Sequence, residues 1–97
     1  ETAIRHKVPI TAIVANNGGP GGATRQREFF GSQCREPVAA YTDGIRHDRI
    51  MEALGGRGIR VQRPGQLRTA LRAALAADSP TCIDVETNGD VQLSPVI

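Results

Sequence analysis

Short apolar runs separated by amphipathic stretches are the main pattern along this chain. Residues 10–15 form a nearly continuous, β-branched run, which is typical of a strand that is covered on both faces. Two further short strands are predicted at 58–61 and 81–85. The chain therefore has three segments that favour a buried sheet.

Helical signals lie between these runs. Residues 1–7 resemble the last turns of a helix that Pro9 stops, and 24–30 predict a short helix. Asp43 or Asp48 is expected to cap a third helix that ends at Gly55 and buries Ile50, Met51 and Leu54. A fourth helix is predicted from Pro64 to Ala77, with an apolar face made of Leu67, Leu71, Ala74 and Leu75.

Strands that alternate with helices predict an α/β fold, in which a parallel sheet is flanked by helices. Residues 31–44 carry few periodic signals and are expected to form a surface connection. The tail from Glu86 has little to pack with, so we expect it to extend onto a partner surface. In such sheets, ligands bind beyond the carboxyl ends of strands.

The segment 16–22 (Asn-Asn-Gly-Gly-Pro-Gly-Gly) follows the first strand at such an end. An Asn amide oxygen and a nearby backbone carbonyl are hard, neutral ligands that suit Mg²⁺, and glycine N–H groups can face phosphate oxygens. Asn-Gly alone also marks a hairpin turn, which remains an alternative. A phosphate-binding P-loop is disfavoured because Lys is missing after Gly22, and the glycine register does not fit a dinucleotide-binding fingerprint.

Composition narrows the possible functions. The chain has 97 residues, a net charge of +2 and three aromatic residues, so a nucleic-acid partner is not expected. It holds no apolar run long enough to span a membrane, and Arg5, His6 and Lys7 interrupt any signal peptide. We therefore expect a cytoplasmic location without a membrane partner. Cys34 and Cys82 lack the spacing of a zinc site and are interpreted as reduced thiols.

Taken in order, these segments resemble the carboxyl-terminal domain of thiamine-diphosphate-dependent enzymes. The similarity covers a helix end and strand leading to 16–19 (Asn-Asn-Gly-Gly), then Glu52-Ala53-Leu54-Gly55, the strand near 59–61, the helix from Pro64, and 83–85 (Ile-Asp-Val). The resemblance implies that residues 1–86 form the carboxyl-terminal part of the domain that binds the cofactor's pyrophosphate, with 87–97 as a tail.

The resemblance also implies site residues. The Asn17 side chain and the Gly19 carbonyl would ligate Mg²⁺, while Gly18, Gly21 and Gly22 would contact thiamine diphosphate. Ala23 and Arg25 would face the substrate, although a solvated helix face is the alternative for Arg25. The family's acidic metal ligand and its activating glutamate are absent from these residues. The expected partners are therefore the amino-terminal and middle domains of the same enzyme, in a homo- or hetero-oligomer.

The resemblance implies a lyase or decarboxylase that acts on a C–C bond next to a carbonyl. Asn-Asn-Gly-Gly at 16–19 looks closest to the branch that contains oxalyl-CoA decarboxylase and 2-hydroxyacyl-CoA lyase. The implied substrate is a small molecule or an acyl-CoA. An acetolactate synthase-like or 2-keto acid decarboxylase-like enzyme is one alternative, and a non-catalytic α/β module that binds an anion is another.

Overall fold

The computed structural model describes residues 1–19, 23–33, 40–89 and 91. The chain divides into two compact units, of which the first comprises 1–16 and 46–86 and the second comprises 17–45 and 87–97. The first unit holds the sheet, and the second holds the turn that follows the first strand. None of the helices in the described ranges has the length and apolar character needed to cross a membrane.

The first unit is a three-stranded parallel sheet with the order β1-β3-β2. Its strands are β1 (Thr11–Asn16), β2 (Arg57–Val61) and β3 (Thr81–Glu86), each within one residue of its predicted bounds. The α/β fold with a parallel sheet is thus confirmed. The parallel pairing of β1 with β3 also shows that the Asn-Gly dipeptide after β1 does not close a hairpin.

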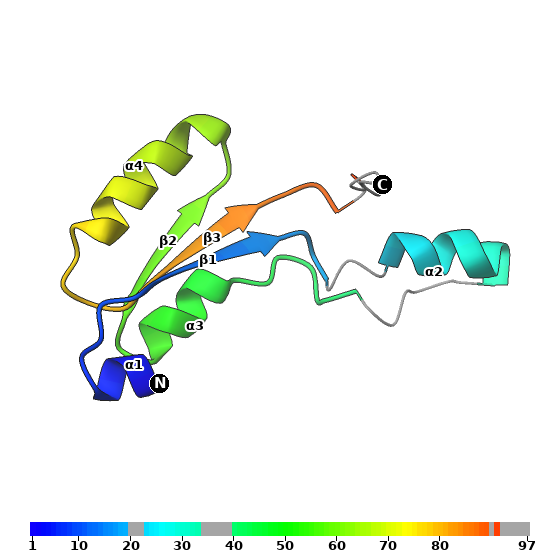
Figure 1. Cartoon of the computed structure of the whole chain (residues 1–97). Coiled ribbons are helices and arrows are strands. Elements are labelled where there is room, and N and C mark those ends of the chain that lie inside the picture. The colour runs from blue at the N-terminus through cyan, green and yellow to red at the C-terminus, as the bar shows by residue number, and fades with distance from the viewer. Residues whose placement is uncertain (20–22, 34–39, 90, 92–97) are drawn as a thin grey trace, which may run out of the picture. The chain divides into compact units, whose positions relative to one another are not determined.

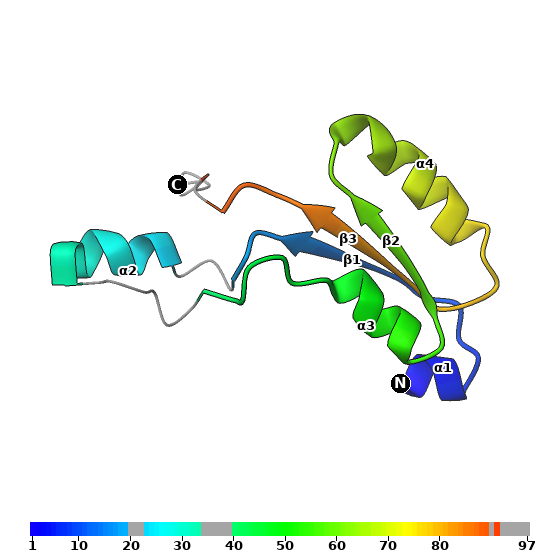
Figure 2. The same cartoon turned by 180° about the vertical axis from the view of Figure 1, so that it is seen from behind.

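Two helices cover opposite faces of this sheet, α3 (His47–Ala53) and α4 (Pro64–Leu75) (Figures 1 and 2). The side chains of β3 alternate between these faces, as a strand requires. Ile83 packs in the apolar core with Ala70 and Ala74 of α4. Asp84 faces the other way and accepts a hydrogen bond from α3. The α4 face is therefore apolar and the α3 face polar.

The remaining helical elements are short. α1 (Thr2–Arg5) precedes β1, as predicted. In the second unit, α2 (Ala23–Phe30) is followed by the 3-10 turn η1 (Gly31–Gln33). The predicted helix at 24–30 is therefore confirmed, and its two aromatic rings, Phe29 and Phe30, meet edge to face in largely exposed positions.

Three details of the predicted burial are wrong. β1 lies at the edge of the described sheet, so Ile13 stays 56 % exposed and the run is not covered on both faces. Ile50 and Leu54 are exposed, because α3 turns Asp48 and Met51 inward instead. Leu75 is 76 % exposed because it lies to the side of the helix face that Ala70 and Ala74 bury, and α4 ends there, two residues earlier than predicted.

The predicted caps also differ from those observed. The residue before α3 is Arg46, and Asp48 lies within the first turn of the helix. α4 starts at Pro64 as predicted, and the Gln66 side chain accepts hydrogen bonds from the N–H groups of Gln62 and Arg63. The bonds give these two N–H groups an acceptor at the start of the helix, where no backbone carbonyl of the preceding turn is available.

Candidate functional site

The turn after β1 is organised by hydrogen bonds of its own. The amide oxygen of Asn17 accepts a hydrogen bond from the Gly19 N–H at 3.3 Å, which is the geometry of an Asx turn. The Gly18 carbonyl accepts a hydrogen bond of 2.7 Å from the Tyr41 N–H. The turn therefore holds the Asn17 side-chain oxygen against the main chain of Gly19.

Gly18 is needed for this shape because its φ is +78°, a left-handed conformation that side chains disfavour. Among the residues that the structure describes, apart from its two chain neighbours, no atom lies within 4 Å of a Cβ built on this glycine, so conformation and not space is the constraint there. The residue is exposed. The turn thus presents an open face on which a ligand can approach the backbone.

A second segment lies against the same turn. β1 and β3 end together, with Asn16 opposite Glu86 in the parallel register, so the chain leaves both strands side by side. Within the second unit, Gly89 lies so close to Asn17 that a Cβ built on it would be 2.5 Å from the Asn17 carbonyl oxygen. The main chain after β3 therefore contacts the main chain of Asn17.

The sequence-predicted site residues fall into three groups. Asn17, Gly18 and Gly19 lie together in the turn after β1. Gly21 and Gly22 lie outside the described residues. Ala23 and Arg25 belong to the first turn of α2. Their roles toward a metal, cofactor or substrate remain predictions.

The oxygen atoms that the turn offers as metal ligands fit one side of a Mg²⁺ site. Mg²⁺ prefers oxygen ligands and often completes its shell with phosphate oxygens and water. The turn supplies neutral oxygens, the amide oxygen of Asn17 and backbone carbonyls. No group of three or more His, Cys, Asp or Glu side chains within the part of the chain that the structure describes could hold a metal ion. An ion at the turn would therefore need further oxygens from a phosphate or from another part of the protein.

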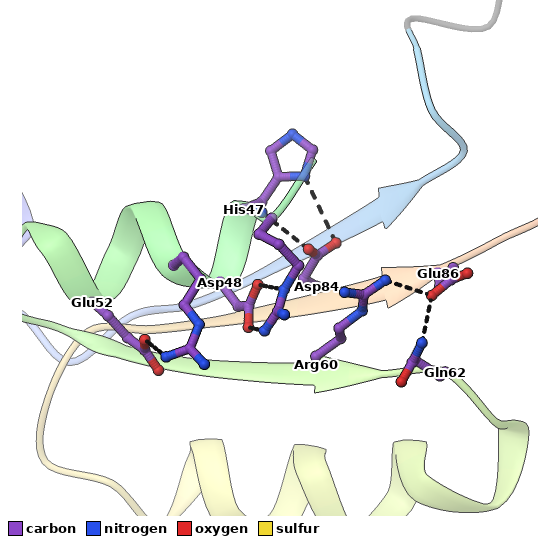
Figure 3. A network of polar contacts seen from close by, with 9 residues as sticks. His47, Asp48, Glu52, Arg60, Gln62, Asp84 and Glu86 are labelled. Atoms are coloured by element: carbon purple, nitrogen blue, oxygen red, sulfur yellow. Dashed lines mark hydrogen bonds and ion pairs between the residues drawn. The ribbon is translucent and has the colours of Figure 1, made fainter. Parts of the chain in front are cut away.

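A polar network occupies the α3 face of the sheet (Figure 3). Asp84, on the central strand, is 1 % exposed. One of its carboxyl oxygens accepts the His47 N–H at 3.0 Å, and the other lies 3.7 Å from His47 Nδ1. The first N–H groups of a helix carry partial positive charge, which favours an acidic side chain at this position. The network thus fastens the start of α3 to the middle of the sheet.

Arg46 and Asp48 form a second, partly buried contact at the same helix end. The Arg46 guanidinium donates two hydrogen bonds to the Asp48 carboxylate, at 2.7 and 2.5 Å. These bonds lower the pKa of Asp48 below its ordinary value, although burial opposes the shift. The same pairing raises the pKa of Arg46. Because the Asp48 carboxylate is buried and paired with Arg46 through two hydrogen bonds, we interpret the pair as structural.

The Arg46–Asp48 pair predicts an acid-sensitive contribution to stability. A carboxyl group whose pKa is lower in the folded state stabilises the fold above its unfolded pKa of about 3.9 and loses that effect as the pH falls toward the folded pKa. We expect Arg46→Met to lower the free energy of unfolding at pH 7, because it leaves the Asp48 carboxylate without its guanidinium partner, and to lower it by less below about pH 3. Urea unfolding at both pH values measures this difference.

Arg49→Met is the matched control, because Arg49 pairs with Glu52 on the exposed side of the same helix. A surface pair of this kind contributes about 0.2–1 kcal/mol. If Arg46→Met were as mild as Arg49→Met at pH 7, or equally costly at both pH values, the assignment to the Asp48 contact would be wrong.

A smaller cluster lies at the carboxyl end of β3. Glu86 accepts hydrogen bonds from Arg60 at 2.8 Å and from Gln62 at 3.0 Å (Figure 3). The Arg60 bond, followed by the Gln62 bond, lowers the pKa of Glu86. All three residues come from the ends of neighbouring parallel strands. They connect β2 to the point where the chain leaves β3.

The sequence reasoning missed Asp84 and Gly89. Asp84 lies within an apolar run, and a charged residue in a strand that is otherwise buried is a signal for a tertiary partner. Gly89 follows Asn88 in a dipeptide that marks a turn, but this pattern gives no indication of the contact with Asn17. Both contacts join segments that are far apart in the sequence.

The chain is similar to known enzymes over most of its length. The family model described as "Thiamine pyrophosphate enzyme, C-terminal TPP binding domain" matches residues 1–85. A probable acetolactate synthase of Mycobacterium bovis is 35 % identical over 92 residues, covering 94 % of this chain and 16 % of that protein. The 2-hydroxyacyl-CoA lyase of Arabidopsis thaliana is 32 % identical over 88 residues, covering 88 % of this chain and 15 % of the lyase.

A third relative is the oxalyl-CoA decarboxylase of Escherichia coli, which is 32 % identical over 90 residues, covering 88 % of this chain and 15 % of that enzyme. The chain thus spans about a sixth of the length of the curated relatives that it matches. The match includes the parallel sheet and the turn after β1. The chain belongs to the thiamine pyrophosphate enzyme family, and it matches the C-terminal TPP binding domain of that family.

Proposed function

We propose that this chain is the cofactor-anchoring part of a thiamine-diphosphate- and Mg²⁺-dependent enzyme that cleaves or forms a C–C bond next to a carbonyl. The turn after β1 carries the proposal, because it holds the Asn17 amide oxygen 3.3 Å from the Gly19 nitrogen in a domain that matches the TPP-binding family. In this proposal, Asn17 and the carbonyl of Gly19 ligate Mg²⁺, which is shared with the cofactor's diphosphate.

The other residues of the segment support this anchor. The left-handed conformation of Gly18 shapes the turn, and its exposed backbone allows close approach of the diphosphate. In this proposal Gly21 and Gly22 also contact the cofactor, and Ala23 and Arg25 contact the substrate. Thiamine diphosphate, when bound, supplies a thiazolium carbon that adds to a carbonyl and accepts negative charge. The protein holds the cofactor in position and balances the charge of its diphosphate.

The remaining ligands and the proton-transferring groups come from the amino-terminal and middle domains of the enzyme in this proposal. The turn supports this part of the proposal. The ligands that it offers are neutral oxygens, so a divalent ion there would need an acidic ligand from elsewhere. The enzyme is therefore expected to assemble its site between domains, in an oligomer.

The proposed substrate class is 2-hydroxyacyl-CoA or an oxalyl-CoA-like thioester. Relatives named for both reactions align over 88 % of the chain. A carboligase that resembles acetolactate synthase is the second candidate, favoured by the 35 % identity to the mycobacterial protein. The two candidates differ in whether a coenzyme A thioester or a free 2-keto acid is consumed.

Cofactor binding with and without metal tests the proposed anchor. We expect the purified enzyme to bind thiamine diphosphate in the presence of Mg²⁺, and removal of the metal with EDTA to weaken that binding by about tenfold or more, because the ion bridges the turn and the diphosphate. Isothermal titration calorimetry of the cofactor, with and without chelator, measures the change.

Two controls separate the alternatives. A module that only binds anions would bind inorganic pyrophosphate as tightly as thiamine diphosphate and would show no metal requirement, which would contradict the proposal. Turnover of a 2-hydroxyacyl-CoA, of oxalyl-CoA and of pyruvate, followed by chromatography of the products, then distinguishes the lyase from the carboligase.

A further inference from the structure

Gly89 has a steric reason to be glycine. A Cβ built on this residue would lie 2.5 Å from the carbonyl oxygen of Asn17 and 3.6 Å from the carbonyl carbon. A real Cβ does not approach an oxygen so closely, so one of the two segments would have to move by about half an ångström or more. The obstacle is backbone, which cannot move aside as the end of a flexible side chain does.

The contact also follows from the sheet. Asn16 and Glu86 are opposite each other in the last rung of the β1–β3 pairing. Parallel strands lie about 4.8 Å apart, so the residues that follow them begin as neighbours. Within the second unit, the segment after β3 then passes Asn17 at Gly89.

The contact lies at the main chain of the residue that is proposed to ligate the metal. Asn17 directs its side-chain oxygen toward Gly19, and a shift of the Asn17 main chain would move that oxygen with it. Mg²⁺ requires ligands at about 2.0–2.1 Å in near-octahedral geometry, so a displacement of a few tenths of an ångström would change its affinity. A main-chain support behind Asn17 would hold the oxygen in place.

We propose that Gly89 is a positioning residue for the cofactor turn, where the main chain of 87–89 fixes the main chain of Asn17 and so aims its amide oxygen at the metal. The inference rests on the proposed function of the Asn17 turn. Gly89 touches neither cofactor nor substrate in this role. It acts through Asn17, and its effect should appear in metal dependence.

The test compares variants of the purified, full-length enzyme. We expect Gly89→Ala to raise the Mg²⁺ concentration that half-saturates thiamine diphosphate binding by about tenfold, the lower range for residues that orient metal ligands. Saturating Mg²⁺ should restore both cofactor binding and turnover, because the ligand is displaced and not lost. Cofactor titrations at a series of Mg²⁺ concentrations measure the shift.

Two controls identify non-specific effects. Gly65→Ala makes the same chemical change in α4, where the added Cβ would meet no atom of another described segment within 4 Å, and should leave the Mg²⁺ requirement unchanged. Ile83→Val removes one methylene from the fully buried centre of the sheet. It should lower the thermal midpoint of the cofactor-free enzyme by a few degrees at most without changing the Mg²⁺ requirement of the folded enzyme.

The outcomes are distinguishable. If Asn17→Ala abolishes metal-dependent binding and Gly89→Ala behaves like the parent, the positioning role is wrong and the proposed function stands. If Ile83→Val shifts the Mg²⁺ requirement as much as Gly89→Ala, the effect is one of stability and the positioning role is also wrong. If the parent enzyme binds thiamine diphosphate without any metal dependence, the proposed function fails and the role of Gly89 fails with it.

Discussion

Asn17→Ala is expected to weaken thiamine diphosphate binding at limiting Mg²⁺ by about 100-fold or more. Substituting a residue that only orients a metal ligand lowers metal affinity by about 10–100-fold. Asn17 is proposed as a ligand itself, so its loss should have at least the upper effect. The fold should survive, because Asn17 is only partly buried and the hydrogen bond that its side chain accepts from the Gly19 N–H is long at 3.3 Å. Losing such a bond costs about 1 kcal/mol.

Asn17→Asp is the conservative counterpart. It keeps an oxygen at the same position, so it can still ligate Mg²⁺ and accept the hydrogen bond from the Gly19 N–H. We expect it to retain metal-dependent cofactor binding that Asn17→Ala loses. Calorimetric titrations of both variants, with thermal unfolding of the cofactor-free forms as the check on folding, make the comparison. An Asn17→Ala enzyme with parental Mg²⁺ dependence would exclude Asn17 as the ligand.

The sheet and the turn could be predicted because they depend on local patterns. The short β-branched runs and the helical spacing after Pro64 gave strands and a helix within about two residues of those observed. The glycine-rich end of β1 marked the turn. Whether a buried-looking run lies at the centre or at the edge of a sheet is not encoded in the run itself. This explains why β1, and not β3, was expected to be covered on both faces.

The orientation of α3 could not be predicted for a different reason. Gly58 on β2 has no side chain, and the main chain of Asp48 fills the space that a Cβ would take. This close approach turns the Asp48 side of the helix toward the sheet and leaves Ile50 exposed. Apolar periodicity cannot reveal a helix that packs through a polar residue, because the partner lies in another segment of the chain.

The same limit applies to the site. Asn17, Gly18 and Gly19 are consecutive, so their pattern suggested a common role. Gly89 contacts Asn17 only because β1 and β3 are neighbours that end in the same register. Strand order is a property of the whole fold, and the chain gives no local signal for it. Contacts between loops that leave adjacent strands therefore emerge only from the structure.

Asp84→Ala is the second change with a large expected effect, here on stability. The Asp84 carboxyl group is almost fully buried and accepts the His47 N–H at 3.0 Å. Alanine would leave that donor without this acceptor at the start of α3, and it would also open a small cavity in the polar face of the sheet. An unsatisfied buried group costs about 1–3 kcal/mol and the cavity adds to it, so we expect a loss of about 2–4 kcal/mol in the free energy of unfolding.

Urea unfolding of the Asp84 variants measures this loss, and Asp78→Ala is the matched control because Asp78 lies in an exposed turn. A substitution at such a surface site changes stability by about 0.5 kcal/mol or less. Asp84→Asn keeps an oxygen that can accept the His47 N–H, and should therefore be milder than Asp84→Ala. If the Asn and Ala variants were equally unstable, the charge of Asp84 and not its hydrogen bond to α3 would be the source of the stabilisation. If neither differed from Asp78→Ala, the contact between β3 and α3 would contribute nothing to the fold that supports the Asn17 turn.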